Sequence, residues 1–328
     1  MEEQNNIEIL DSEAAVTETS AIDAPVVDAP EKPEKKKGKF KWSKIFGEKR
    51  SPLQKSVFVI IFIIFVLYAL TMLFPFIWLI LNSFKSGEEF FLSGRSSFAF
   101  PLKFTAENYG MVFSEYNFGL MFLRSLLLAG GGTLLTLITS SMAAYTVAKY
   151  KFPGRGIIYG VVIFALIVPV VGTLPAQYAL MKGLGLSNSF IGVLIIYSGG
   201  FGFNFLLLYS YFKNLSWGYA EAALVDGAGD FRVFWRIMIP LSRPALVAVG
   251  IIQFIGLWND YQSPYLYWRS NPTLAVGLQD LYTQYKNTPA EYPAIFAAIV
   301  LALIPIVTIF CVFSKIIMEN TVVGGLKG

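Results

Sequence analysis

The chain has 328 residues, of which 55% are hydrophobic, 16% aromatic and only 15% charged, and its formal net charge is +4. This apolar content exceeds that of a water-soluble domain and is typical of a protein that crosses a membrane several times. With no histidine and one cysteine, Cys311, the sequence excludes a disulfide framework, histidine-ligated metals and Ser-His nucleophiles. We therefore expect no catalytic residue and no metal site in this chain.

Residues 1–50 change along the chain from acidic, between Glu2 and Glu34, to strongly basic, from Lys35 to Arg50. Such a segment cannot bury enough apolar surface to offset the entropy lost on ordering. We therefore predict a disordered cytoplasmic tail. Its lysines would be attracted to anionic lipid headgroups by about 1 kcal/mol per charge near the surface.

Six apolar runs of at least about 18 residues follow the tail, each long enough to cross a bilayer as a helix. They cover residues 54–83, 119–147, 157–181, 189–212, 242–262 and 292–317. Because lipid offers no hydrogen bonds to the backbone, only helices or closed barrels can span it, and runs of this length indicate helices. Residues 51–328 are thus predicted to form an all-α polytopic membrane domain with six transmembrane helices.

Basic residues indicate the orientation of these spans. The loops that carry Lys149 to Arg155, Lys213 to Arg243, and Lys315 fall on the same side as the basic tail. Positively charged loops stay in the cytosol. We therefore expect both termini and the polar insert at residues 213–241 to be cytoplasmic.

The interiors of the six predicted spans contain no Asp, Glu, Lys or Arg, and only Arg124 and Asp260 lie toward their outer ends. A proton-coupled carrier or a voltage sensor needs a charge at membrane depth on which its driving force acts. Transport would therefore take its energy from elsewhere. A sodium-coupled carrier that uses backbone carbonyls stays open as an alternative. A membrane enzyme would need serine or tyrosine chemistry without an evident base.

The polar insert between the fourth and fifth spans reads as helix, bend, helix. Ser216 is expected to cap a helix over residues 219–225, Gly227 and Gly229 to break it, and Asp230 to cap a second segment. In that segment three apolar residues recur at spacings of three and four, which predicts one apolar stripe: Phe231, Phe234 and Met238.

The first helix of the insert suits a groove on a partner protein. Ala222 and Ala223 keep it slim, and Glu221 and Asp226 offer carboxylates to a basic surface. The insert is therefore predicted to dock onto a cytosolic partner. An amphipathic hairpin lying on lipid headgroups is the alternative.

A string within the insert resembles the EAA loop of permease subunits in bacterial ABC importers: Glu221-Ala222-Ala223-x-x-Asp226-Gly227-Ala228, with Phe231 and Pro240 at the usual distance. Further segments resemble the carbohydrate importers of the maltose-permease type, namely residues 143–155, Trp258-Asn259-Asp260-Tyr261 and Thr273-Leu274-Ala275-Val276-Gly277-Leu278. The resemblance covers about residues 55–328.

This resemblance implies a type I importer permease fold in a bacterial plasma (inner) membrane, with a coupling helix seated in a cleft of a cytosolic ATPase subunit. The residues it assigns to that contact are Glu221, Ala222, Ala223, Asp226, Gly227, Ala228 and Phe231. The C-terminal Gly325, Lys327 and Gly328 would reach into the ATPase dimer. The chain itself would be no enzyme and would bind no cofactor, since ATP and Mg would bind the ATPase subunits.

The other partners implied are a second permease subunit, an extracellular sugar-binding protein and membrane lipid, with no nucleic acid. The ligand would be a carbohydrate, an oligosaccharide in the maltose-type case. Asn204, Gln253 and Asn259 could hydrogen-bond its hydroxyls, although bonds between helices are an equal interpretation. A polyol or glycerol-phosphate ligand stays open, and Arg124 is the only basic residue that would suit a phosphate.

Overall fold

The computed structural model describes residues 52–91, 97–168 and 172–323, which form helices joined by turns and contain no strand within these ranges. The contacts divide the chain into two compact units, Met1–Ile63 and Ile64–Gly328, and every contact given below lies in the second. The predicted tail at residues 1–50 and the three C-terminal residues Gly325, Lys327 and Gly328 lie outside the described residues.

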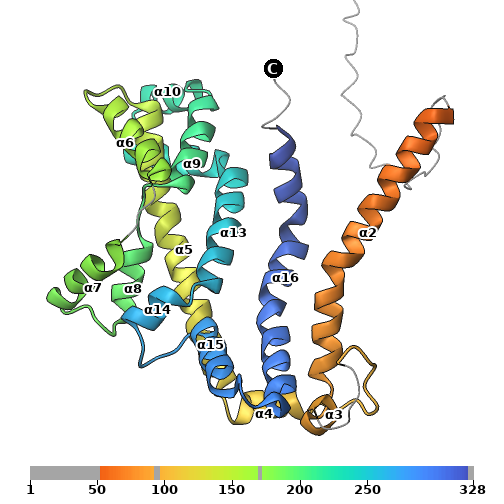
Figure 1. The fold of residues 1–328 in the computed structure, drawn as a ribbon. Coiled ribbons are helices and arrows are strands. Elements are labelled where there is room, and N and C mark those ends of the chain that lie inside the picture. Colours follow the sequence, from red (N-terminus) through yellow and green to blue (C-terminus); the bar gives the residue numbers. More distant parts are fainter. Residues whose placement is uncertain (1–51, 92–96, 169–171, 324–328) are drawn as a thin grey trace, which may run out of the picture. The chain divides into compact units, whose positions relative to one another are not determined.

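The helices drawn in Figure 1 are α2 (Pro52–Ser83), α3 (Gly87–Phe91), α4 (Glu107–Ser114), α5 (Phe118–Lys149), α6 (Arg155–Ile167), α7 (Thr173–Gly183), α8 (Phe190–Tyr197), α9 (Phe203–Asn214), α10 (Gly218–Val225), α11 (Asp230–Val233), the π-helix η1 (Phe234–Met238), α12 (Ile239–Leu241), α13 (Arg243–Asn259), α14 (Gln262–Tyr267), α15 (Leu274–Tyr285), the 3₁₀ turn η2 (Pro289–Glu291) and α16 (Tyr292–Val323).

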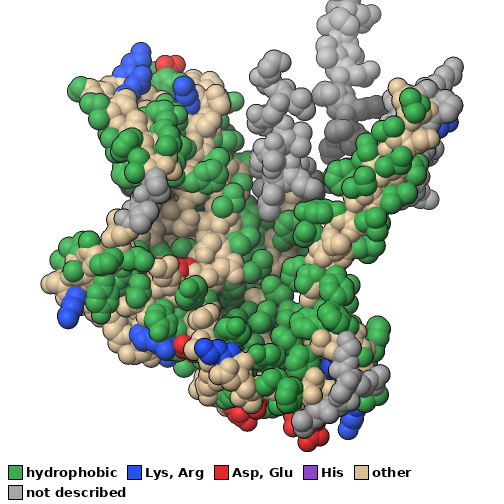
Figure 2. All heavy atoms as spheres, in the orientation of Figure 1, with side chains coloured by type: hydrophobic (Ala, Val, Ile, Leu, Met, Phe, Trp, Pro, Cys, Tyr) green, Lys and Arg blue, Asp and Glu red, His purple; other side chains and the backbone are tan. Residues whose placement is uncertain are grey.

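Three continuous helices among the described residues are long and apolar enough to cross a membrane: Leu53–Ser83, Phe118–Lys149 and Pro289–Ser314. They coincide with the first, second and sixth predicted spans. A fourth is counted if Asp230–Leu241 and Arg243–Asn259, which meet at a bend of 78°, are taken as one broken span. Figure 2 shows hydrophobic side chains over much of the visible surface of α2, as expected where the surroundings are lipid.

The third and fourth predicted spans are not continuous helices, which corrects the sequence-based prediction. Residues 157–181 fall on α6 and α7, and residues 189–212 on α8 and α9. Glycines with positive φ directly precede the second half of each pair, Gly172 at 83° and Gly202 at 145°. Because this backbone region favours glycine over residues with a Cβ, these glycines mark where the helices restart.

Side chains of α5 hold the break in the fourth span. The hydroxyl of Thr136 donates to the carbonyl of Tyr197 at 2.6 Å, and that of Thr139 donates to the carbonyl of Ser198 at 2.9 Å. The last carbonyls of a helix have no partner within it, and inside a membrane they must find one elsewhere. The two threonines therefore make an interrupted helix compatible with a water-poor environment.

The long helix α5 is the central element of Ile64–Gly328 and packs against both α9 and α13. Its close approach to its neighbours requires a glycine at position 132. A Cβ added to Gly132 would lie 2.7 Å from Leu257 Cδ1 and 2.8 Å from Tyr197 Cδ2. The small-residue face of the second span thus serves tight helix packing.

Candidate functional site

The polar insert folds into a bent hairpin, which we define as residues 218–241 and which contains α10, α11, η1 and α12. Its first helix starts one residue before the predicted 219–225 and ends at Val225 as predicted. Gly227 follows with φ of 81°, a left-handed conformation that stops the helix. The predicted order of helix, bend, helix is therefore what the structure has.

The two predicted caps differ from the structure. Trp217, not Ser216, occupies the cap position of α10, and the Ser216 hydroxyl accepts a hydrogen bond from the Gly218 N–H at 3.3 Å. Gly229 precedes α11, so Asp230 is its first residue rather than its cap. The Asp230 carboxylate instead accepts a hydrogen bond from the Tyr150 hydroxyl.

The inner face of the hairpin is buried against the C-terminal end of α5. Ala220, Val233, Phe234 and Met238 form one apolar cluster with residues of α5 and α9. The ring of Phe234 lies 5.1 Å from that of Tyr145 on α5. Burying these side chains orders the hairpin on the helix bundle.

Phe231 does not belong to this buried face, which corrects the predicted stripe of Phe231, Phe234 and Met238. Phe231 is 68% exposed, whereas Phe234 is 4% exposed and Met238 is fully buried. Phe231 lies in the single turn α11, where Val233 is buried in its place, whereas Phe234 and Met238 lie in η1 and stay on the buried face.

A hydrogen-bonded latch ties the hairpin to the turn after α5. The Tyr150 hydroxyl donates to Asp230 Oδ1 at 2.7 Å and lies 3.4 Å from the Tyr145 hydroxyl. The Tyr150 ring meets Trp217 edge to face at 5.8 Å. Lys149 Nζ also donates to the Leu215 carbonyl. These contacts fix Asp230 of the hairpin and the segment that leads into α10 to the C-terminal end of α5 and the turn after it.

Burial, with added contributions from the hydrogen bonds to Tyr145 and Asp230, raises the pKa of the Tyr150 hydroxyl above its ordinary value near 10. The hydroxyl therefore keeps its proton and donates throughout the physiological pH range. Tyr150 was not identified from the sequence, because its partner lies 80 residues away and no local pattern links them.

The outer face of the hairpin is exposed and carries most of the predicted docking residues. Glu221, Ala222, Asp226, Gly227 and Phe231 are exposed, and Ala223 and Ala228 are partly buried. Neither Glu221 nor Asp226 forms an ion pair with any described residue. Both carboxylates are therefore available to a basic partner.

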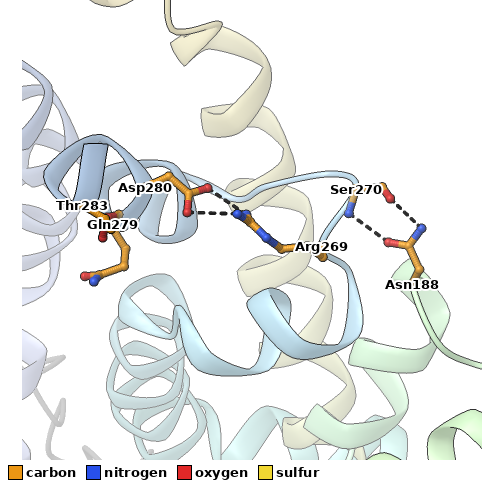
Figure 3. Close-up of polar contacts among 6 residues, drawn as sticks. All are labelled: Asn188, Arg269, Ser270, Gln279, Asp280 and Thr283. Carbon is orange, nitrogen blue, oxygen red and sulfur yellow. Dashed lines mark hydrogen bonds and ion pairs between the residues drawn. The ribbon is translucent and has the colours of Figure 1, made fainter. Parts of the chain in front are cut away.

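The first part of α5 contacts a second polar region, drawn in Figure 3. Arg269 pairs bidentately with Asp280 on α15 at 2.7 and 3.1 Å, and Asn188 exchanges two hydrogen bonds with Ser270 at 2.9 and 3.0 Å. The hydrogen bond to Asp280 raises the pKa of Arg269. Here the polar groups satisfy one another. Among the described residues no group of three or more His, Cys, Asp and Glu is placed to hold a metal.

Two of the three predicted ligand residues lie together. Asn204 on α9 donates to Gln253 Oε1 on α13 at 2.6 Å, and Gln253 Nε2 faces Thr136 Oγ1 at 3.5 Å. Asn259 instead donates to the Ile255 carbonyl of its own helix at 2.8 Å. The structure thus forms an amide pair between helices and leaves Asn259 outside it.

Comparison with known proteins identifies the family. Residues 136–320 match the family described as "Binding-protein-dependent transport system inner membrane component". The chain is 33% identical to the diacetylchitobiose uptake system permease protein of Streptomyces coelicolor over 76% of this chain and 82% of the relative. It is 34% identical to the arabinooligosaccharides transport system permease protein of Bacillus subtilis over 80% of this chain and 94% of the relative.

A solved structure has the same fold. It is that of a bacterial ABC transporter involved in the import of the acidic polysaccharide alginate, with a TM-score of 0.71 and 24% identity over 82% of this chain and 99% of that chain. This helical fold agrees with the family match and with the two related permeases. The chain belongs to the family of inner membrane components of binding-protein-dependent transport systems.

Proposed function

We propose that this chain is the transmembrane permease subunit of an ATP-driven ABC importer for a carbohydrate of the oligosaccharide class. The names of its relatives support this ligand class, since permeases for diacetylchitobiose and for arabinooligosaccharides are each more than 30% identical to the chain. The absence of Asp, Glu, Lys and Arg from the interiors of the predicted spans supports an energy source outside the membrane.

The observation that carries the proposal is the contrast between the two faces of the hairpin. Its inner face is buried on α5, and Asp230 is bonded to Tyr150. Its outer face exposes the EAA-type residues, with Glu221 and Asp226 unpaired within the described residues. A rigid element with a free, patterned face suits docking. We propose that α10 is the coupling helix and that ATP-driven closure of two ATPase subunits moves it together with α5, α9 and α13.

The proposed topology has six spans, of which the third (α6 and α7) and the fourth (α8 and α9) are broken. Both termini and the hairpin would be cytoplasmic in a bacterial plasma membrane, with residues 1–50 as a tail. Figure 2 shows blue and red side chains both at the end where α6 and α10 lie and at the opposite end. The cytoplasmic orientation is supported by the basic residues of the loops from Lys149 to Arg155 and from Lys213 to Arg243. Charged side chains are stable in water and costly in lipid.

The proposed assembly contains a second permease subunit, an ATPase dimer that binds ATP and Mg, and an extracellular sugar-binding protein. The C-terminal Gly325, Lys327 and Gly328 would contact the ATPase dimer. The family description supports the delivery of ligand by a binding protein.

We also propose that Asn204 and Gln253 line the transport pathway, with Asn259 as a further ligand contact. Both amides are only partly buried although they lie within predicted spans. Polar groups at membrane depth face a protein interior or a water-filled cavity rather than lipid. The bond between the two amides leaves other amide atoms free to meet sugar hydroxyls.

Charge reversal at the hairpin tests the proposed function. We expect Glu221→Lys to abolish co-purification of the ATPase subunit and ligand uptake, because it places a like charge against a basic partner surface. The matched control is Glu107→Lys on α4, an exposed residue with the same change of charge, which should retain both. Normal uptake and ATPase retention in Glu221→Lys would refute the docking role, and uptake that follows a sodium gradient without an ATPase would favour a secondary carrier.

A further inference from the structure

The outer face of the hairpin contains a basic hollow beside the coupling helix α10. This open hollow of about 560 Å³ is lined by Gly227, Gly229, Phe231, Arg232, Trp235 and Arg236. Both arginines are exposed, and neither forms an ion pair or a hydrogen bond with a described residue through its side chain. The proposed docking of α10 through Glu221 and Asp226 leaves these two guanidinium groups without a role.

The local backbone shapes the hollow. Val233 at the end of α11 and Phe234 and Met238 in η1 are buried, whereas Trp235 and Arg236 of η1 are exposed and line the hollow with Phe231 and Arg232. The rings of Phe231 and Trp235 meet edge to face at 6.1 Å and form an apolar wall. The glycines at 227 and 229 add no side chain at the rim. An apolar wall lowers the local dielectric constant and strengthens the attraction between guanidinium groups and an anion.

The two guanidinium groups of the hollow suit a carboxylate ligand. Guanidinium groups offer planar pairs of donors that match the two oxygens of a carboxylate. A phosphate in a lipid headgroup would meet the same donors. The surrounding charges favour a protein, because Glu221 and Asp226 are exposed on the same hairpin and would be repelled by an anionic membrane surface. A folded protein partner can offer a basic group to these carboxylates and an acidic group to the hollow.

We propose that an acidic side chain of the ATPase subunit enters this hollow and pairs with Arg232 and Arg236, as a second contact of opposite sign beside α10. This inference rests on the proposed function, since it requires an ATPase docked on the hairpin. Two adjacent contacts of opposite charge define the orientation of a bound partner, which one contact cannot do. The hollow would therefore fix how the ATPase is oriented on the hairpin, and with it the direction in which α5 is moved.

The test is ATPase retention by the full importer complex purified from membranes. The variant Arg232→Glu/Arg236→Glu reverses the charge of the hollow, and Arg232→Gln/Arg236→Gln removes it. The matched control Lys151→Glu/Arg243→Glu makes the same change of charge at exposed residues on the same predicted side. We expect the glutamate pair to lower retention about tenfold or more, which corresponds to about 1.4 kcal/mol, and the control to stay within about twofold.

Rescue separates a direct contact from misfolding. Each acidic residue on the docking face of the ATPase is replaced by arginine, one at a time. One of these ATPase variants should bind the permease variant Arg232→Glu/Arg236→Glu again. The same ATPase variant should not bind the permease variant Glu221→Lys. The proposal is overturned if the glutamate pair retains the ATPase normally, if no single arginine restores it, or if the only effect is weaker binding of anionic lipid vesicles. Loss in Glu221→Lys with full retention in the arginine variants would leave the proposed function standing and remove this inference alone.

Discussion

The two ends of α5 contact polar regions that satisfy their charges differently. Near its first part, where the Leu274 N–H donates to Ser125 Oγ at 2.7 Å, Arg269 is paired with Asp280. Near its last part, the hairpin exposes Glu221, Asp226 and both hollow arginines without an ion pair among the described residues. Charges that pair with one another stabilise the fold, whereas unpaired charges on a rigid surface are available to a partner. The difference supports the proposal that the outer face of the hairpin, rather than the α14–α15 region, binds a partner.

Breaking the inner face of the hairpin should have the largest effect. Phe234→Ala removes a fully packed ring beside Tyr145, and such changes in a core cost about 3–5 kcal/mol. We expect a lower thermal unfolding midpoint in detergent together with loss of ATPase retention. Phe231→Ala, at the exposed face, is the matched control and should leave the midpoint unchanged while weakening ATPase binding. Equal effects on stability would contradict the separation into two faces.

The bend of the hairpin gives the next prediction. Gly227 has φ of 81°, and a residue with a Cβ pays about 1–2 kcal/mol in this left-handed region. Gly227→Ala should therefore lower stability and uptake. Gly229→Ala is the control, because Gly229 has φ of −73° and, like Gly227, no atom within 4 Å of an added Cβ. If both variants unfold at the same temperature, backbone strain does not determine the bend.

The latch between α5 and the hairpin gives a smaller effect. Tyr150→Phe removes only the hydroxyl that bonds Asp230, and a hydrogen bond of this kind contributes about 1 kcal/mol. We expect the ATPase to stay bound and to hydrolyse ATP, while ligand uptake per ATP falls. The effect of Tyr150→Phe should be the same at pH 7 and pH 9. The raised pKa keeps the wild-type hydroxyl protonated at both values, and stability from this group would be lost only as the pH rises through that pKa.

The Tyr150→Phe prediction has a matched control in Tyr292→Phe, which removes a hydroxyl that donates to the Lys286 carbonyl at 2.7 Å, outside the hairpin, and should leave uptake per ATP unchanged. Combining Tyr150→Phe with Asp230→Ala should add little to either single change, because both remove the same bond. Fully additive effects on uptake per ATP would argue against the latch.

Breaking the paired region should have the smallest effect. The Arg269 and Asp280 side chains are 50% and 38% exposed, and exposed ion pairs contribute about 0.2–1 kcal/mol. Asp280→Asn should slightly lower the unfolding midpoint and leave ATPase retention unchanged. A loss of the ATPase in this variant would show that the contrast between the two regions is false.

The parts of the fold that depend on the length of an apolar run could be predicted from the sequence. The first, second and sixth spans and the extent of α10 agree with the structure within a few residues. The breaks near Gly172 and Gly202 were missed, because an apolar run has the same composition whether its helix is continuous or interrupted. Glycines alone do not distinguish the two cases, since Gly132 lies inside an unbroken helix and serves close packing.

Parts of the site depend on contacts that no local pattern shows. The position of Phe231 was mispredicted because the packing of the short helix α11 buries Val233 instead, which the spacing of apolar residues does not show. Asp230 was predicted as a cap, whereas its carboxylate accepts from Tyr150 in another turn of the chain. The extent of α10 was easier to predict, because Gly227 ends the helix through its local backbone conformation, whereas the docking role of its exposed residues stays a prediction.

The most direct test of the account measures access to the hairpin in the membrane. Val225 is 87% exposed, and Val225→Cys in a Cys311→Ser background places a single thiol on the outer face of α10. Membranes with and without the ATPase subunit are treated with a water-soluble maleimide, and Gln279→Cys on α15 serves as the control. We predict that the ATPase protects Val225→Cys and leaves Gln279→Cys equally labelled. Equal labelling of Val225→Cys in the presence and absence of the ATPase would contradict the account.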